Sequence, residues 1–340
     1  MSLDILKEDL KNKTLRNLYL FYGPEEYLKR FYMHAIEEIL LEGEYRTFNK
    51  ITLEGKVETE KIIEATETMP LFSEKKMVIV KNTTLLKSKK KTEEEVGKNK
   101  PKNDDFLGYL QNIPSYTCVV FSELEIDKRM KAIDTIKKNG LIVEFPFQKP
   151  AELVKWVMKG FKSFKKEINP MVASELVENS EQGMHEILNE INKVVLFVGD
   201  RREVCSKDIQ EVCTKSIKSR IFDLTDAISE KKPVSALKLL NDMVVLKEPL
   251  PKILFMITRQ FRQVLEMKLL NEKGILGNEA ASKMGISPYA ASKIQKQTRT
   301  FSVALLKMAL EESLTFDLAI KTGKLNDRMA VELLISKFAK

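Results

Sequence analysis

The stretch LYLFYGPEEYLKR, residues 18–30, decides how the first part of the chain folds. Its five leading apolar and aromatic residues predict a buried strand, Gly23 predicts a tight turn, and the residues after Pro24 begin a helix. P-loop proteins use the same order of strand, glycine turn and helix to hold a nucleotide. We therefore predict an α/β domain that opens on a loop of this architecture.

The residues of this loop lack the chemistry of nucleotide binding. A working loop needs a second glycine, a Lys for the phosphates and a Ser or Thr for Mg²⁺. Pro24 has no N–H, and Glu25 and Glu26 stand at the start of the helix. Carboxylates suit the positive end of the helix dipole but repel a polyphosphate. Gly23, Pro24, Glu25 and Glu26 are thus predicted to form a degenerate loop, without a nucleotide cofactor and without hydrolysis.

Short apolar runs alternate with helical patterns in the first part of the chain, which is typical of a parallel sheet with crossover helices. The five predicted strands are 18–22, 47–53, 77–81, 117–121 and 141–145. The predicted helices between them are 25–41, 58–68, 104–111 and 127–139. Together they predict one doubly wound, five-stranded domain at residues 1–145.

Helices replace strands beyond this point. Pro146 and Pro150 mark a boundary, because proline disfavours helix at the residue before it. Helical periodicity then covers 151–164, 170–179 and 184–197, without strand patterns, and predicts a small helical domain at 146–214. A third block at 215–340 is predicted to be an all-α bundle that is able to pack against copies of itself. Its five predicted helices are 233–245, 251–271, 288–298, 301–316 and 326–338.

Composition excludes several classes of protein. No apolar run approaches the ~20 residues that cross a bilayer, and the N-terminus is not signal-like, so we expect a cytoplasmic protein. Three cysteines without CxxC spacing argue against a disulfide framework and a zinc site. With only His34 and His185, and no GxSxG, HExxH or paired-acid motif, the chain offers no predicted metal site and no catalytic site of its own.

The net charge of +8 is unevenly distributed. From residue 215 onward there are 22 Lys and Arg against 13 Asp and Glu, whereas the first 214 residues are close to neutral. This asymmetry indicates either a polyanionic partner such as nucleic acid or lysine-rich helix faces in water. The run KSKKKTEEEVGKNKPK at 87–102 has no apolar periodicity and is interpreted as a solvated loop.

The segment TMPLFS, residues 68–73, combines apolar side chains with a proline in a short connection. Leaving Met69, Leu71 and Phe72 in water forgoes roughly 1.5–3 kcal/mol of burial for each. Two interpretations stay open at this point. The side chains fold back onto their own domain, or they form an exposed anchor for a pocket on a partner.

A helix, a glycine turn and a second helix over 281–298 could pass for a DNA-reading helix-turn-helix. The spacing from Ala281 to Gly285 fits this motif. Ala291, however, stands where a larger aliphatic residue usually fixes the second helix. Sequence-specific DNA binding is therefore an alternative that the pattern disfavours.

Four segments now point to a known family. They are LYLFYGPEEYLKRF at 18–31, MPLFSEKKMVIVKN at 69–82, KILFMITRQFRQVLEMKLL at 252–270 and FDLAIKTGKLNDRMAVELLISKF at 316–338. With them the chain resembles the delta subunit of the bacterial DNA polymerase III clamp loader over essentially its whole length. The resemblance implies an AAA+-like α/β domain, a small helical lid domain and a helical collar domain that serves oligomerisation.

The resemblance also implies a function. It describes a subunit of a DNA-directed DNA polymerase holoenzyme that binds the sliding clamp (beta subunit) and helps open it on primed DNA, without hydrolysing ATP. Met69, Leu71 and Phe72 match the family's clamp-binding residues. The collar would contact the other loader subunits, delta-prime and tau/gamma. Lys321, Lys324 and Arg328 are possible DNA or partner contacts.

Two apolar anchors are too few for a stable complex. Burying Leu71 and Phe72 yields ~3–6 kcal/mol, whereas a micromolar complex needs about 8 kcal/mol. We therefore expect a second contact surface, formed by the opening helix of the first domain and the strand after the anchor segment.

The chief alternative function is an active AAA+ ATPase with an atypical loop. It is disfavoured because Lys29 and Arg30 lie too far into the helix to replace a P-loop Lys, and no Ser or Thr follows them. The second alternative is the helix-turn-helix DNA-binding protein described above.

Overall fold

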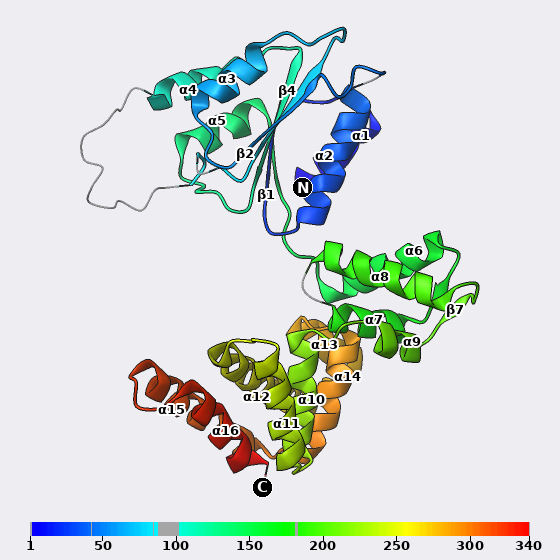
Figure 1. The fold of residues 1–340 in the computed structure, drawn as a ribbon, viewed down its shortest axis with the longest axis vertical. Coiled ribbons are helices and arrows are strands. Elements are labelled where there is room, and N and C mark those ends of the chain that lie inside the picture. The colour runs from blue at the N-terminus through cyan, green and yellow to red at the C-terminus, as the bar shows by residue number, and fades with distance from the viewer. Residues whose placement is uncertain (1, 42, 84, 88–101, 181–182, 340) are drawn as a thin grey trace. The chain divides into compact units, whose positions relative to one another are not determined.

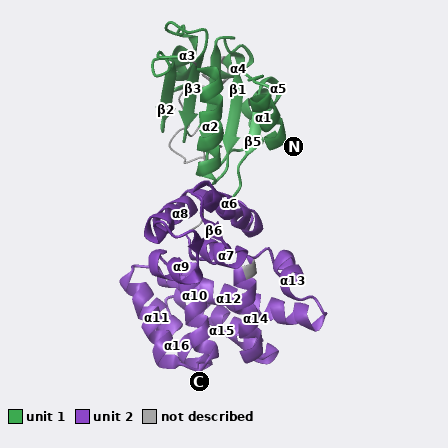
Figure 2. Ribbon diagram, turned by 90° about the vertical axis from the view of Figure 1, so that its right-hand side faces the viewer, with its two compact units in different colours: residues 1–147 green, residues 148–340 purple. Residues whose placement is uncertain are grey.

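The computed structural model describes residues 2–41, 43–83, 85–87, 102–180 and 183–339. The charged run at 87–102 lies almost entirely outside these residues. The chain forms two compact units, unit 1 at Met1–Phe147 and unit 2 at Gln148–Lys340, which Figure 2 shows in green and purple.

Unit 1 is built on a five-stranded parallel sheet with the order β2-β3-β4-β1-β5. The strands are β1 (Leu18–Tyr22), β2 (Lys50–Glu54), β3 (Lys76–Lys81), β4 (Thr117–Glu123) and β5 (Leu141–Glu144). The prediction of five parallel strands is confirmed. β1, β3 and β4 are buried along almost their whole length, because strands of a parallel sheet are covered on both faces.

Helices cover both faces of this sheet (Figure 1). One face packs on α1 (Ser2–Lys11) and α2 (Glu26–Leu40), and the other on α3 (Thr59–Glu67), α4 (Lys102–Gln111) and α5 (Lys131–Asn139). Successive strand residues point to opposite faces, so Tyr19 and Phe21 belong to the α2 core while Leu18 and Leu20 belong to the α3 core. The predicted doubly wound domain is confirmed.

The described residues between 148 and 213 form four helices and two very short strands. The helices are α6 (Pro150–Ser163), α7 (Pro170–Asn179), α8 (Met184–Val198) and α9 (Ser206–Val212). The prediction that strands stop after the first domain was wrong, because β6 (Glu167–Ile168) and β7 (Glu203–Val204) pair in parallel. Two-residue strands are too short for an alternating pattern. α9 was also missed, since it has only seven residues and a cysteine, Cys205, at its N-cap.

The C-terminal part is all-α, as predicted, but it contains more helices than the predicted five. The described helices are α10 (Ile217–Ser229), α11 (Pro233–Val245), α12 (Leu250–Glu272), α13 (Gly277–Met284), α14 (Pro288–Thr300), α15 (Val303–Lys321) and α16 (Asp327–Phe338). α10 was missed although the side chain of Ser216 caps its N-terminus. α12 lies at the centre of the bundle and packs on α10, α14, α15 and α16.

The two parts of unit 2 have separate apolar cores. Buried residues between Val154 and Cys213 form one cluster, and those between Ile217 and Ala339 form another. This agrees with a lid at 146–214 and a collar at 215–340, and we keep these names for the two parts. The division of unit 2 into two domains stays a prediction. None of the helices that the structure describes is long and apolar enough to span a membrane.

Gly23 allows the turn between β1 and α2. Its φ of +120° is rare for residues with a side chain, and an added Cβ would lie 2.4 Å from the carbonyl oxygen of Phe145. We expect Gly23→Ala to destabilise unit 1 by about 3 kcal/mol. Chemical unfolding followed by circular dichroism measures this change.

Gly108→Ala provides the matched control. Gly108 lies in α4, where an added Cβ meets nothing within 4 Å, so this variant should be neutral or about 1 kcal/mol more stable. Equal stabilities for the two variants would contradict the steric role of Gly23.

Candidate functional site

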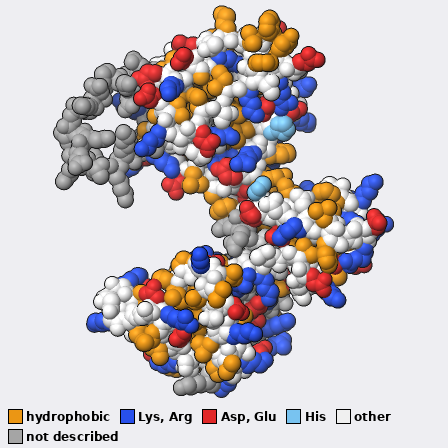
Figure 3. Space-filling view, viewed as in Figure 1, with side chains coloured by type: hydrophobic (Ala, Val, Ile, Leu, Met, Phe, Trp, Pro, Cys, Tyr) orange, Lys and Arg blue, Asp and Glu red, His pale blue; other side chains and the backbone are white. Residues whose placement is uncertain are grey.

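The apolar segment at 69–72 connects α3 to β3 and lies at the surface of unit 1. Met69 is 78% exposed, Leu71 49% and Phe72 77%. Figure 3 shows hydrophobic side chains gathered at the end of unit 1 where α3 leads into β3. Of the two interpretations left open by the sequence, these exposures favour the exposed anchor. We call residues 69–72 the anchor segment.

The side chain of Asn49 holds the backbone of the anchor segment in place. Its Oδ1 accepts a hydrogen bond from the Leu71 N–H at 2.7 Å, and its Nδ2 donates to the Leu71 carbonyl at 2.8 Å. Nδ2 also donates to the carbonyl of Tyr45, and the Asn49 backbone carbonyl accepts from Met77 N–H in β3. Asn49 is only 3% exposed. A buried amide therefore links the anchor segment to the edge of the sheet.

The start of the segment is fixed through the last turn of α3. The carbonyls of Thr66, Glu67 and Thr68 accept hydrogen bonds from the Thr117 hydroxyl, the Tyr116 hydroxyl and the Lys76 ammonium. These are carbonyls that a helix end leaves without a partner of its own. Burial lowers the pKa of Lys76, and its Nζ is held by the Thr68 carbonyl. The anchor segment thus begins at a fixed point.

Two further aromatic residues extend the apolar surface. Tyr45 and Phe48 lie in the connection between α2 and β2 and are 45% and 66% exposed. The ring of Phe72 lies 5.1 Å from that of Tyr45, and Phe72 has a φ of +51°, an uncommon backbone conformation for a large residue. Sequence reasoning missed both residues, because it placed Phe48 in a strand that begins only at Lys50. The signal that could have identified them is the presence of two aromatic residues in an otherwise polar connection between a helix and a strand.

The degenerate loop uses its own backbone groups internally. Gly23 N–H donates to the carbonyls of Glu123 and Leu124, each at 3.2 Å, and Glu25 N–H donates to Phe145 O at 3.0 Å. The Glu25 carboxylate, which is 1% exposed, accepts from Tyr27 N–H and caps α2. In a P-loop such N–H groups would bind phosphate oxygens. Here they already have partners.

Lys29 is also directed inward. It is fully buried, its Nζ donates to the Glu123 carbonyl at 3.0 Å, and it forms an ion pair with Glu26 at 2.5 Å. Glu123 ends β4, and its carboxylate accepts hydrogen bonds from the N–H and hydroxyl of Thr83. Burial raises the pKa of Glu123, and the hydrogen bonds from Thr83 oppose this shift. Sequence reasoning missed this internal role of Lys29.

The three possible DNA contacts lie at the surface around the end of α15 and the start of α16. Lys321 forms an ion pair with Asp317 at 2.6 Å, and Arg328 forms one with Glu332 at 2.8 Å. Lys324 is exposed in the turn between these helices. The structure therefore brings the three cations into one region, with two of their charges offset by carboxylates on the same helix.

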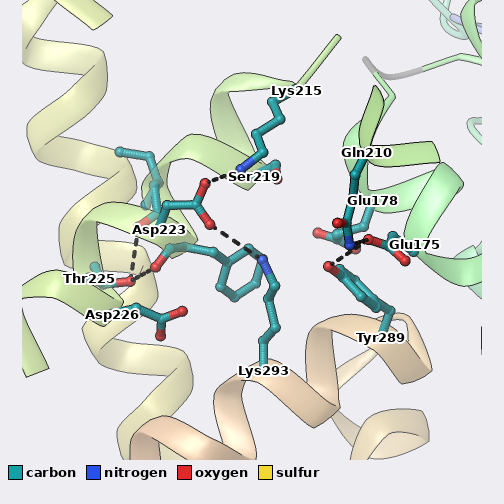
Figure 4. Close-up of polar contacts among 12 residues, drawn as sticks. Glu175, Glu178, Gln210, Lys215, Ser219, Asp223, Thr225, Asp226, Tyr289 and Lys293 are labelled. Atoms are coloured by element: carbon teal, nitrogen blue, oxygen red, sulfur yellow. Dashed lines mark hydrogen bonds and ion pairs between the residues drawn. The ribbon is translucent and has the colours of Figure 1, made fainter. Parts of the chain in front are cut away.

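The second helix of the apparent helix-turn-helix is α14, and its N-terminus is packed on the lid. Ser287 is fully buried and donates to Glu178 at 2.8 Å, while Tyr289 N–H donates to the hydroxyl of Ser174 at 3.0 Å. Figure 4 shows the same junction with Glu175 and Glu178 of α7 facing Tyr289. A recognition helix reads bases with its N-terminal residues. In α14 these residues contact α7 instead.

Two family models match the chain. The model described as DNA polymerase III, delta subunit, matches residues 19–146, and that of the DNA polymerase III delta subunit, C-terminal domain, matches residues 218–338. The chain belongs to the DNA polymerase III delta-subunit family. The resemblance recognised in the sequence is confirmed. The delta-subunit family places the chain in the clamp loader of a multi-subunit replication complex.

Two comparisons with Bacillus subtilis agree with this assignment. DNA polymerase III subunit delta of Bacillus subtilis is 28% identical, over 100% of this chain and 97% of the relative. The solved structure of the Bacillus subtilis DNA clamp loader delta protein is 27% identical, covers 100% of this chain and 99% of its own, and has a TM-score of 0.52. A gamma subunit-related protein of Thermotoga maritima is 13% identical, with a TM-score of 0.38 over the full length of both chains.

Asn49→Ala tests how the anchor segment of this delta-subunit family member is held. The change leaves the N–H and carbonyl of Leu71 without their partner, so we expect a loss of about 1–3 kcal/mol in stability. Hydrogen exchange of the Leu71 amide should accelerate at least tenfold, while that of Val78 in β3 changes less. Unchanged exchange at Leu71 would show that other contacts hold the segment.

Proposed function

We propose that the anchor segment binds a hydrophobic pocket on the sliding clamp and that the chain helps open the clamp for loading onto primed DNA. The observation that carries the proposal is the exposure of Met69, Leu71 and Phe72 on a backbone that Asn49 holds in place. Exposed apolar side chains on a fixed backbone suit an interface anchor, because little conformational freedom is lost on binding.

The second contact surface has a better candidate than the one expected from the sequence. β3 lies between β2 and β4, and its residues from Lys76 to Val80 are buried, so this strand does not present a surface. Tyr45 and Phe48 are exposed beside the anchor segment. They add two aromatic side chains to the ~3–6 kcal/mol of Leu71 and Phe72, which brings a micromolar complex within reach.

Opening the clamp requires a preference between two of its states. A ligand shifts a conformational equilibrium only by the difference between its affinities for the two states. The chain therefore binds the open interface of the clamp more tightly than the closed one. A rigid anchor segment suits this task, because a flexible loop would adapt to the open and the closed clamp interface equally well and would not distinguish between them.

We propose further that the chain works without binding ATP. The N–H groups of Gly23 and Glu25 are already bonded, Pro24 has none, and the Glu25 carboxylate occupies the N-cap of α2. The Lys29 ammonium already forms an ion pair with Glu26 and donates a hydrogen bond to the Glu123 carbonyl. These contacts support a degenerate loop over the alternative of an active ATPase with an atypical one.

The collar is proposed to bind the other loader subunits, delta-prime and tau/gamma. Met308, Leu314 and Leu318 of α15 are 46%, 61% and 54% exposed, so three large apolar side chains project from the exposed side of this long helix. Lys321, Lys324 and Arg328 follow at the end of the same helix and remain proposed contacts to DNA or a neighbouring subunit. The proposed location is the cytoplasm.

The clamp-binding proposal predicts the behaviour of Leu71→Ala combined with Phe72→Ala. Both side chains are largely outside the core, so the variant should fold normally and lose at least 100-fold in clamp affinity, about 3 kcal/mol. Isothermal calorimetry against the sliding clamp of the same organism measures this loss.

Leu314→Ala combined with Leu318→Ala is the matched control, because it removes two exposed apolar side chains from the collar. It should leave clamp affinity unchanged. Wild-type affinity in the anchor-segment variant would refute the proposal.

The nucleotide proposal predicts no saturable ATP binding to the isolated chain at millimolar concentrations, with or without Mg²⁺. The internal partners of the loop N–H groups are the reason. Equilibrium dialysis with labelled ATP is the measurement. A saturable isotherm with one site per chain would mean that the loop rearranges, and the proposed inactivity would be wrong.

A further inference from the structure

The lid carries a concentration of positive charge that clamp binding does not use. Five lysines and no carboxylate occur between residues 155 and 166, although the lid as a whole has about as many acidic as basic residues. Lys155, Lys159 and Lys162 are spaced four and three residues apart on α6, so they share one face of the helix. Val154, Val157 and Phe161 form its buried face.

This charge borders a hollow in the lid surface. The hollow has a volume of about 730 Å³ and is lined by Met158, Lys162, Lys165, Lys166, Glu167, Ile168 and Arg202. Four of these residues are cationic and one is acidic. Figure 3 shows Lys and Arg side chains at the end of the lid that carries the β6–β7 pair. The hollow is therefore suited to an anionic ligand.

Some cations at the hollow already have partners within the protein, and others do not. Lys166 donates to the carbonyls of Gly199 and Arg201, and Arg202 pairs with Glu167 at 2.6 Å. These contacts build the rim. Lys159, Lys162 and Lys165 are exposed, and no carboxylate pairs with them in the part of the chain that the structure describes.

Stabilisation of the helix end does not account for these lysines. A cation near a helix C-terminus contributes about 0.3–1 kcal/mol, and the effect falls off within the last turn. Lys159 lies before the last turn of α6, and Lys165 follows the helix with a φ of +58°. This conformation closes the helix, because Lys166 N–H donates to Phe161 O at 2.9 Å and Lys165 N–H donates to Lys162 O at 3.0 Å. These bonds use the backbone of Lys165 and leave its exposed ammonium group available to a ligand.

An exposed aromatic residue stands among the lysines. Phe164 is the C-cap residue that follows α6, between Lys162 and Lys165, and it is 44% exposed. Surfaces that bind single-stranded nucleic acid combine cations that follow the phosphates with aromatic rings on which bases stack. An acidic protein partner would use the cations but would have no need for the ring.

We infer that the lid surface formed by Lys159, Lys162, Phe164, Lys165 and the rim of the hollow binds single-stranded nucleic acid. The lysines contact successive phosphates, and Phe164 stacks on a base. This surface shares no residue with the anchor segment or with the cations at the end of α15. The inference does not depend on clamp binding, because it rests on other residues.

The test uses the full chain and a fluorescently labelled oligothymidylate of about 20 nucleotides, with anisotropy measured over a range of salt concentrations. Lys162→Ala combined with Lys165→Ala should lower affinity about tenfold at low salt. It should also reduce the slope of log affinity against log salt by about 1.4, because each lost phosphate contact removes about 0.7 for single strands. Phe164→Ala should lower affinity about tenfold without changing this slope.

Lys137→Ala combined with Lys138→Ala is the matched control, since it removes two exposed lysines from α5 in unit 1. It should bind as the wild type does. Thermal unfolding confirms that each variant is folded, and clamp affinity should be equal in all of them. A lid variant that keeps both the wild-type affinity and the wild-type salt slope would overturn the inference.

Two competitors separate the single strand from other anionic partners. A duplex of the same length and polyglutamate of matched charge should each compete at least tenfold more weakly than unlabelled oligothymidylate. Equal competition by polyglutamate, with Phe164→Ala neutral, would identify an acidic protein surface instead. Equal competition by the duplex would show that only the phosphate backbone is bound. Either outcome would overturn the assignment to a single strand.

Discussion

The pair of hydrogen bonds between the Asn49 amide and the backbone of Leu71 determines what the surface of unit 1 presents. An apolar segment of four residues would normally collapse onto its own domain, because each large side chain left in water forgoes roughly 1.5–3 kcal/mol. A buried amide that satisfies both polar groups of one residue opposes this collapse. Leu71 and Phe72 are thereby kept outside the core.

The sheet supplies the second half of this constraint. The carbonyls at the end of α3 accept hydrogen bonds from three side chains of the sheet region. These are Lys76 in β3, Tyr116 in the connection before β4, and Thr117 in β4. The segment is therefore held just before its first residue, through the end of α3, and at Leu71 by Asn49, which directly precedes β2. Asn49, Lys76 and Thr117 are all buried, so side chains in the interior of unit 1 hold the backbone from which the exposed side chains project.

Much of the fold could be predicted because its elements have strong patterns. The strand and turn at 18–23 identified the α/β domain, and α7 and α11 were predicted to their exact ends. Pairs of two residues such as β6 and β7 leave no periodic signal, so they could not be found. α10 was missed because its core-facing residues are interrupted by two buried polar residues, Ser219 and Thr225. The Thr225 hydroxyl donates to the Ile221 carbonyl, a bond that a sequence does not display.

The sequence allowed the residues of the candidate site to be predicted, but not the contacts that hold them in place. Apolar residues beside Pro70 marked the anchor segment, but the role of Asn49 depends on a pairing across 22 residues that no local pattern encodes. Phe48 was placed in a strand, because aromatic residues favour strands wherever burial is not known. The resemblance to the family identified the segment, and the structure adds the contacts that hold it.

The loop at residues 23–26 keeps the strand-turn-helix architecture of a P-loop while its backbone N–H groups are bonded internally. A P-loop leaves its N–H groups free for phosphates, which costs stability until a nucleotide binds. In this chain the same groups bond to the ends of β4 and β5, and the Lys29 ammonium bonds to the end of β4. The strand-turn-helix junction is thus stabilised without a ligand. Internal bonds of this kind order the junction by themselves, which agrees with the proposal that the chain works without binding ATP.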